Sequence, residues 1–125
     1  MQLNLENPDF RYILRGVDAE GVRVNEQSVH GSFILTPMEL IEDWRPQTVA
    51  ELLPEDFEPI LALNPSLVLL GTGEHQRFPS PAALAACLTR GIGIEVMSSA
   101  AAARTFNVLA TEGRKVVAAF LQTSF

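Results

Sequence analysis

The sequence predicts a compact mixed α/β domain, and three observations indicate it. Residues 66–71 form a continuous apolar run, typical of a strand covered on both faces. Residues 91–120 contain a strand, a helix and a strand with very short connections, which predicts a parallel β-α-β unit. Residues 12–36 alternate apolar and polar side chains, as antiparallel strands with one wet face do. At 125 residues, we expect one domain, 1–125.

The N-terminal half is expected to form antiparallel β-strands, in the same sheet or beside it. Four strands are predicted, at 12–17, 21–25, 29–36 and 39–44. Asp18-Ala-Glu-Gly is a good hairpin turn between the first two strands, and Pro46 closes the last one. Residues 48–64 suit one or two short helical turns, because Pro54 fits a first helical position and Pro59 prevents a long uninterrupted helix.

The C-terminal half is expected to be β-α-β-α-β. The elements are a strand at 66–71, a helix at 81–90, a strand at 93–97, a helix from Ser98 or Ser99 to about residue 111, and a strand at 115–120. Ser80 followed by Pro81 is a helix start, and Gly91 and Gly113 are helix stops. Two right-handed crossovers then form a small parallel sheet.

Composition excludes several functions. A formal charge of −6 without a basic stripe argues against nucleic-acid binding. No apolar run approaches the roughly 20 residues that span a bilayer, and residues 1–7 lack a basic, apolar leader, so we expect a cytoplasmic protein without membrane insertion. His30 and His75 lie far apart, and Cys87 is expected on the apolar face of a helix. We therefore expect no metal, no cofactor and no catalytic residue set.

Acidic residues gather between positions 39 and 58, where Arg45 is the only basic side chain. They are Glu39, Glu42, Asp43, Glu51, Glu55, Asp56 and Glu58. Most such clusters are solvated faces, and a docking surface for a basic partner is the functional alternative. Trp44, beside this cluster, is expected to be core or partly buried, or an interface anchor if exposed.

Glu95 is the one carboxylate within a strand that should otherwise be apolar. An ionised carboxylate on a covered face costs several kcal/mol, roughly, unless it is paired or hydrogen-bonded. We therefore interpret Glu95 as half of a structural pair with an arginine, such as Arg104, or as a residue at a solvent-reached strand end. A catalytic role is the weaker interpretation, because no second acid-base group stands at a defined spacing.

A rim of small and polar residues is expected where two parallel strands end. Ligands bind outside the carboxyl ends of strands in open α/β sheets, and free amides at a helix start favour anions. The loop after residue 70 lacks both the third glycine of a dinucleotide fingerprint and the Gly-Lys-Ser/Thr of a phosphate loop. The candidate pocket is Gly71, Thr72, Gly73, Glu95, Met97, Ser98, Ser99, Arg104 and Asn107. Ordinary serine capping, and fastening of a neighbouring loop by Asn107, are the structural alternatives.

Four segments resemble a widespread family of small domains of unknown function. They are Trp44-Arg-Pro, Leu69-Leu-Gly-Thr-Gly, Gly93-Ile-Glu-Val-Met-Ser-Ser and Ala103-Arg-Thr-Phe-Asn-Val-Leu-Ala-Thr-Glu-Gly-Arg. The family is related to a mitochondrial assembly factor of respiratory complex I and to an adipogenesis-associated domain protein. The resemblance implies a three-layer α/β domain with a central mixed sheet and no established activity. The matching positions are Gly71, Gly73, Glu95, Met97, Arg104, Asn107, Glu112 and Arg114, whereas Ser98-Ser99 and Phe106 depart from the family pattern.

Two functions remain open at this point. The first is a non-enzymatic binding or assembly-type module that contacts other proteins, supported by the resemblance and the acidic segment. The second is a small-molecule or anion-binding domain, and an enzyme if it has an activity, that uses the rim around Gly71, Glu95, Ser98 and Arg104. The sequence favours the first and specifies neither an oligomeric state nor a partner.

Overall fold

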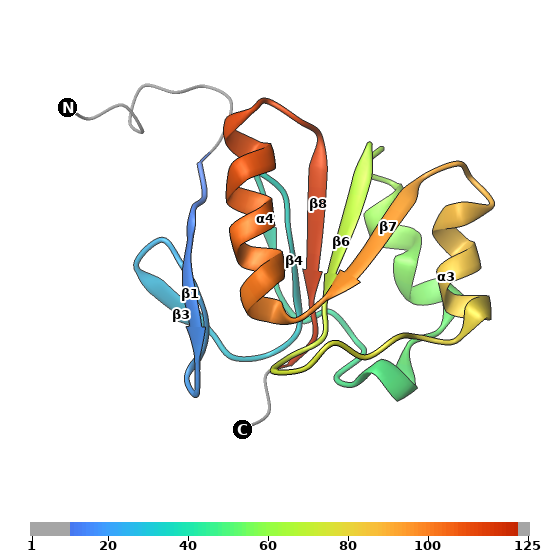
Figure 1. Cartoon of the computed structure of the whole chain (residues 1–125), viewed down its shortest axis with the longest axis horizontal. Coiled ribbons are helices and arrows are strands. Elements are labelled where there is room, and N and C mark those ends of the chain that lie inside the picture. The colour runs from blue at the N-terminus through green and yellow to red at the C-terminus, as the bar shows by residue number, and fades with distance from the viewer. Residues whose placement is uncertain (1–10, 123–125) are drawn as a thin grey trace.

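A five-stranded mixed sheet is the centre of the computed structural model, which describes residues 11–122 (Figure 1). The strand order is β5-β4-β8-β6-β7, with bounds β4 Phe33–Leu35, β5 Leu40–Ile41, β6 Leu67–Gly71, β7 Gly93–Met97 and β8 Val116–Phe120. Strand β6 pairs in parallel with both β7 and β8, while β4 pairs antiparallel with β8 and β5. The predicted mixed sheet, with its parallel C-terminal portion, is confirmed.

A separate three-stranded antiparallel sheet lies beside it. Its strands are β1 Leu14–Asp18, β2 Gly21–Val24 and β3 Gln27–Val29. The predicted hairpin turn joins β1 to β2, with Asp18 opposite Gly21, and the Asp18 carboxylate accepts a hydrogen bond from the backbone N–H of Glu20 at 2.8 Å. The N-terminal half therefore contributes strands both to the central sheet and to a second sheet.

The structure describes five helices, and the two longest begin after the capping serines that the sequence indicates. The five are η1 Val49–Glu51, η2 Pro54–Phe57, α2 Glu58–Leu61, α3 Pro81–Leu88 and α4 Ser99–Thr111. Ser80 Oγ accepts from the Ala83 N–H and Ser98 Oγ from the Ala101 N–H, each at 3.2 Å. Gly91 follows α3 with φ 73°, in the left-handed region that favours glycine at a helix end.

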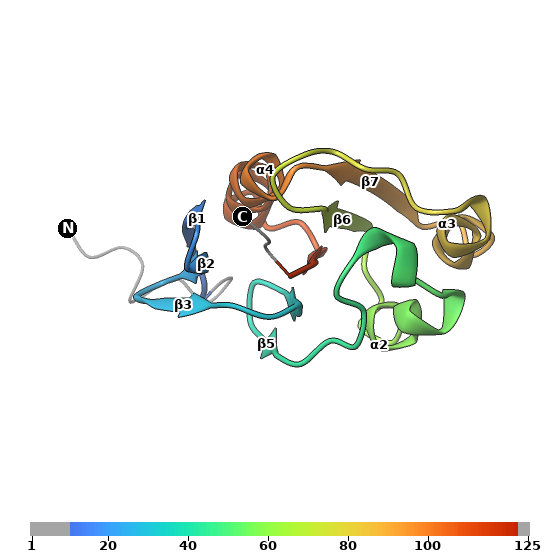
Figure 2. The ribbon, with the colours of Figure 1, turned by 90° about the horizontal axis from the view of Figure 1, so that it is seen from below.

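Two apolar cores fill the opposite faces of the central sheet, because successive strand residues point to opposite sides. Leu69 and Ala118 face the core formed with α4 and the three-stranded sheet. Val68 and Val117 face the core formed with η2, α2 and α3. Figure 2 shows α4 and α2 on the two sides of the sheet, which gives the three layers that the family resemblance implies.

Three sequence expectations about strands are wrong. The strand predicted at 39–44 comprises only β5, Leu40–Ile41. Residues 29–36 do not form one strand: β3 and β4 belong to different sheets, and the chain turns between them at residues 30–32. Ser32 fixes this turn, since its carbonyl accepts from the Trp44 N–H at 3.0 Å and its Oγ accepts from the Gln122 N–H at 2.8 Å. Glu95 is exposed rather than covered, because β7 is an edge strand. Residues 1–7, on which the expectation of no leader rested, lie outside the described residues.

Candidate functional site

The structure brings together the rim residues at the carboxyl ends of β6 and β7. The Thr72 N–H donates to the Met97 carbonyl at 3.0 Å. The Gly73 N–H donates to Ser99 Oγ at 2.9 Å, and the Ser99 N–H returns a bond to the Gly73 carbonyl at 2.8 Å. The loop after β6 and the start of α4 are therefore fastened directly to each other.

Glycine is required at position 71 because the rim is closely packed. A Cβ at Gly71 would lie 2.8 Å from Cδ1 of Phe120 and 3.1 Å from Ser99 Oγ, and the first distance is shorter than real Cβ contacts allow. Phe120 is fully buried at the end of β8, where its ring stacks on Phe33 with centroids 5.0 Å apart. The glycine thus permits close packing rather than access for a ligand.

The polar groups of the loop after β6 also bond within the fold. The Thr72 hydroxyl donates to the His75 carbonyl at 2.6 Å and accepts from the Arg77 N–H at 3.1 Å. Gln76 Nε2 donates to the Val96 carbonyl at 2.8 Å, so the loop is also tied to β7. These bonds occupy the Thr72 hydroxyl and the Gln76 amide, which an anion at the strand ends would otherwise contact.

The other predicted site residues lie away from the rim or have structural partners. Glu95 and Arg104 are exposed, and neither forms an ion pair with another of the described residues 11–122. The expected buried Glu95–arginine pair is therefore wrong; Glu95 is reached by solvent, although it lies in the middle of β7 rather than at a strand end. Asn107 on α4 bonds to β1 in both directions: Oδ1 accepts from the Leu14 N–H at 2.9 Å, and Nδ2 donates to the Leu14 carbonyl at 2.8 Å. The fastening role expected for Asn107 is confirmed.

A cavity of about 280 Å³ opens beside the rim, and two of the nine predicted residues, Thr72 and Gly73, line it. The rest of its wall is Gln47, Thr48, Val49, Glu74, His75, Arg77, Leu121 and Gln122. The imidazole Nε2 of His75 lies 3.8 Å from a Glu74 carboxylate oxygen, and both side chains are exposed. A ligand-binding role for any of the nine residues stays a prediction.

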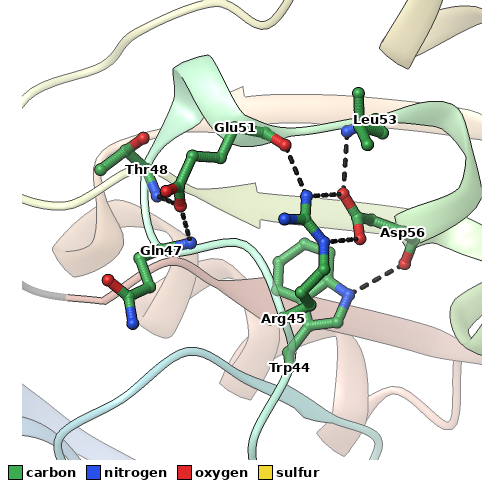
Figure 3. A network of polar contacts seen from close by, with 7 residues as sticks. All are labelled: Trp44, Arg45, Gln47, Thr48, Glu51, Leu53 and Asp56. Atoms are coloured by element: carbon green, nitrogen blue, oxygen red, sulfur yellow. Dashed lines mark hydrogen bonds and ion pairs between the residues drawn. The ribbon is translucent and has the colours of Figure 1, made fainter.

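Sequence reasoning missed the polar network around Arg45 and Asp56 (Figure 3). Arg45 Nε and Nη2 donate to the two carboxylate oxygens of Asp56 at 2.8 and 2.7 Å. The Leu53 N–H also donates to this carboxylate, and Trp44 Nε1 donates to the Asp56 carbonyl, at 2.8 and 2.9 Å. The Arg45 guanidinium holds the pKa of Asp56 below its usual value, although burial opposes this effect.

The network closes residues 44–56 into a fixed loop. Arg45 Nη2 also donates to the Glu51 carbonyl at 2.6 Å. Glu51 Oε1 accepts from the Gln47 N–H at 2.7 Å and from the Thr48 N–H at 3.3 Å, as Figure 3 shows. The one sequence signal for this arrangement was a single arginine within an acidic stretch, next to a tryptophan. Two nitrogens of that arginine, Nε and Nη2, are engaged by the fold.

An acidic cavity of about 230 Å³ lies against this loop. Its apolar walls are Ile34, Ile41, Trp44 and Pro59, and its charged walls are Glu42, Asp43, Arg45, Glu55 and Asp56. Because Arg45 and Asp56 neutralise each other, the carboxylates of Glu42, Asp43 and Glu55 remain, and all three residues are exposed. Trp44 is buried, as expected, and its side chain forms part of the cavity wall.

Within residues 11–122, no helix is long and apolar enough to cross a bilayer. The same residues include no group of three or more His, Cys, Asp or Glu side chains that could hold a metal ion. Cys87 is buried in α3, and burial raises the pKa of its thiol.

These features define a three-layer mixed α/β domain whose distinctive polar residues mostly fasten the fold. The chain belongs to the family described as "Protein of unknown function (DUF498/DUF598)", whose model matches residues 14–121. This confirms the resemblance noted in the sequence.

Two relatives and one solved structure are informative. The chain is 32% identical over 121 residues, 95% of its length, to the bovine (Bos taurus) NADH dehydrogenase [ubiquinone] 1 alpha subcomplex assembly factor 3, of which it spans 65%. It is 39% identical over 57 residues, 46% of each chain, to a Francisella tularensis protein called 13 kDa major membrane protein. An NMR structure of a Xanthomonas campestris protein shares 55% identity, with a TM-score of 0.83, over 98% of this chain and 92% of that one.

Proposed function

We propose that the chain is a non-enzymatic binding module of the assembly-factor type, and that its acidic cavity contacts a basic segment of a partner protein. The observation that supports this most strongly is the pairing of Arg45 with Asp56, which leaves three carboxylates around an apolar floor. The name of the bovine relative supports a role in assembling other proteins.

The acidic cavity has the two parts that a protein-docking surface needs. Ile41 and Pro59 offer apolar contact, while Glu42, Asp43 and Glu55 offer charge to lysine or arginine. The loop behind them is already fixed by hydrogen bonds, so little conformational entropy is lost on binding. A basic segment would also be attracted over a distance by the −6 charge of the chain.

The test compares partner capture by three versions of the purified protein. The first is the unchanged protein, the second carries Glu42→Lys and Glu55→Lys at the cavity, and the third carries Glu20→Lys and Glu26→Lys on the three-stranded sheet. All four glutamates are exposed, so both variants change the net charge equally without removing a buried contact. Captured proteins are quantified by mass spectrometry from extracts of the source cell.

We expect a reproducible partner that the cavity variant loses by at least about tenfold and the control variant retains. Equal capture by both variants would show that the acidic cavity does not bind the partner. The absence of any reproducible partner would remove the binding-module function itself. Circular dichroism and thermal unfolding of both variants check that the fold is unchanged.

A ligand site at the rim is the second candidate, and the cavity that Thr72 and Gly73 line favours it. Arg77 supplies a cation there. Titration with inorganic phosphate, followed by amide chemical shifts, tests it. Saturable shifts confined to residues 72–77 that Arg77→Ala abolishes would support an anion site, and an absence of shifts would leave the rim as a fastening device. Glu95→Gln and Arg104→Ala test the two exposed residues in the same way.

We also propose that the protein is cytoplasmic. A free, buried Cys87 and the lack of a membrane-crossing helix in the described residues support this. Cell fractionation followed by immunoblotting checks it, and recovery in the membrane fraction after a high-salt wash would contradict it.

A further inference from the structure

A third cavity, of about 240 Å³, lies at the end of the central sheet opposite the rim. It exists because the paired strands end at different points. The last β4 residue, Leu35, pairs with Ala118, and β8 starts at Val116, so the first two β8 residues have no β4 partner. The cavity walls are the turn 36–39, Leu63, Pro65 and residues 113–117.

Two adjacent cations, Arg114 and Lys115, stand at this cavity, and the backbone fixes both. The Arg114 N–H donates to the Leu109 carbonyl at 3.0 Å, and its carbonyl accepts from the Val116 N–H at 2.9 Å. The Lys115 carbonyl accepts from both the N–H and the Oγ of Ser66, at 2.8 and 3.0 Å. Both residues are exposed, and neither side chain has a hydrogen-bond or ion-pair partner among residues 11–122.

These cations are unusual in this chain. Lys115 is the only lysine in a sequence of net charge −6. The Arg114 side chain serves neither the fold of the described residues nor the acidic cavity. The lining includes one acid, Glu39, so the cavity is net positive. Arg11 lies at the same corner, because its N–H donates to the Pro37 carbonyl at 2.6 Å.

The remaining lining is apolar and suited to a side chain. Pro37, Met38, Leu63 and Pro65 contribute to it, and Met38 is 44% exposed at its edge. Methionine adapts readily to differently shaped partners. The volume lies below the roughly 300–1,000 Å³ of small-molecule pockets, so it suits one large apolar side chain of a peptide better than a whole ligand.

We propose that this basic cleft, formed by residues 36–39, 63–65 and 113–117, binds an acidic segment of a partner protein. One large apolar side chain of that segment enters the cavity, and carboxylates beside it meet Arg114 and Lys115. The inference rests on the proposed function only in taking a protein as the partner. Its surface and charge preference are independent of the acidic cavity, which takes a basic segment.

The test uses three fluorescein-labelled peptides of ten residues. One has Glu and Asp around a central Leu-Phe pair, the second replaces every acid by its amide, and the third replaces Leu-Phe by Ala-Ala. Binding is measured by fluorescence anisotropy at low and at physiological salt. Four versions of the protein are compared: the unchanged protein, Arg114→Glu/Lys115→Glu, Met38→Glu, and the control Arg23→Glu/Arg90→Glu. The control reverses the charge of two other exposed arginines, so its total charge change equals that of Arg114→Glu/Lys115→Glu.

We expect the acidic Leu-Phe peptide to bind roughly tenfold more tightly than either analogue, and more weakly at higher salt. Arg114→Glu/Lys115→Glu and Met38→Glu should each weaken binding at least about fivefold, and the control should not. Amide shifts of the unchanged protein should map to residues 36–39 and 113–117.

Three results would overturn the proposal. The first is equal binding of the acidic and amide peptides, and the second is shifts located elsewhere. The third is a concentration-dependent dimer in sedimentation that Arg114→Glu/Lys115→Glu abolishes, because a second copy would then occupy the cleft. None of these three results affects the test of the acidic cavity, because that test changes neither Arg114 nor Lys115.

Discussion

Replacing Asp56 by asparagine removes the charge at the centre of the network in Figure 3. The wild-type carboxylate accepts three bonds, two from Arg45 and one from the Leu53 N–H. The amide keeps one acceptor oxygen and turns an NH₂ group toward donors, so at least one charge-assisted bond is lost. Such bonds contribute about 1.5–3 kcal/mol. Because the Asp56 side chain is 7% exposed but that of Arg45 is 54% exposed, we take the lower half of this range, about 2 kcal/mol.

Urea unfolding at pH 7 measures this loss, with Glu20→Gln as an exposed control. For a chain of this size, about 2 kcal/mol corresponds to a fall in Tm of roughly 8 °C. The folded-state pKa of Asp56 lies below its unfolded value, so its stabilisation is present above about pH 4 and declines as the pH falls toward the folded pKa. The gap between wild type and Asp56→Asn should therefore narrow from pH 5 to pH 2.5. A loss under about 0.5 kcal/mol, or a gap that does not change with pH, would refute this reasoning.

Three further predictions concern the fold. Gly71→Ala forces a Cβ against the ring of Phe120 and should lower the free energy of unfolding by about 1–3 kcal/mol, whereas Gly31→Ala, with open space around it, should change it little; urea unfolding compares them. Asn107→Ala leaves backbone groups of β1 without their partners and should cost about 1–2 kcal/mol, with faster hydrogen exchange in β1 than in β6. Cys87 should not react with a thiol reagent at pH 8 until urea unfolds the chain, because it is buried and its pKa is raised; fast native reaction would contradict its burial.

Local rules predicted the C-terminal half well. Ser80 with Pro81 and Ser98 mark helix starts by side-chain bonds that reach only three residues along the chain. The apolar run of β6 correctly indicated burial on both faces, and Asn107 in mid-helix correctly indicated a hydrogen bond to another element. In each case the determining interaction is local, or the residue type is anomalous for its position.

The remaining features could not be predicted from the sequence, because they depend on contacts between residues far apart in the chain. The exposure of Glu95 depends on β7 being an edge strand, and no pattern within β7 specifies its place in the sheet order. The break between β3 and β4 depends on Ser32 contacting Gln122, which is 90 residues away. The Arg45–Asp56 pair spans a turn with no regular period, so a spacing rule does not find it. An arginine alone among acids was the one usable signal.

Hydrogen exchange of the captured complex tests directly whether the acidic cavity is the surface that binds the partner. The protein is labelled alone and with its partner, and the protection of each peptic fragment is compared by mass spectrometry. If the acidic cavity is the docking surface, fragments covering residues 39–58 gain protection on binding, and Glu42→Lys/Glu55→Lys abolishes that gain. Protection confined to residues 72–77 and 95–104, with no change at residues 39–58, would contradict docking at the acidic cavity.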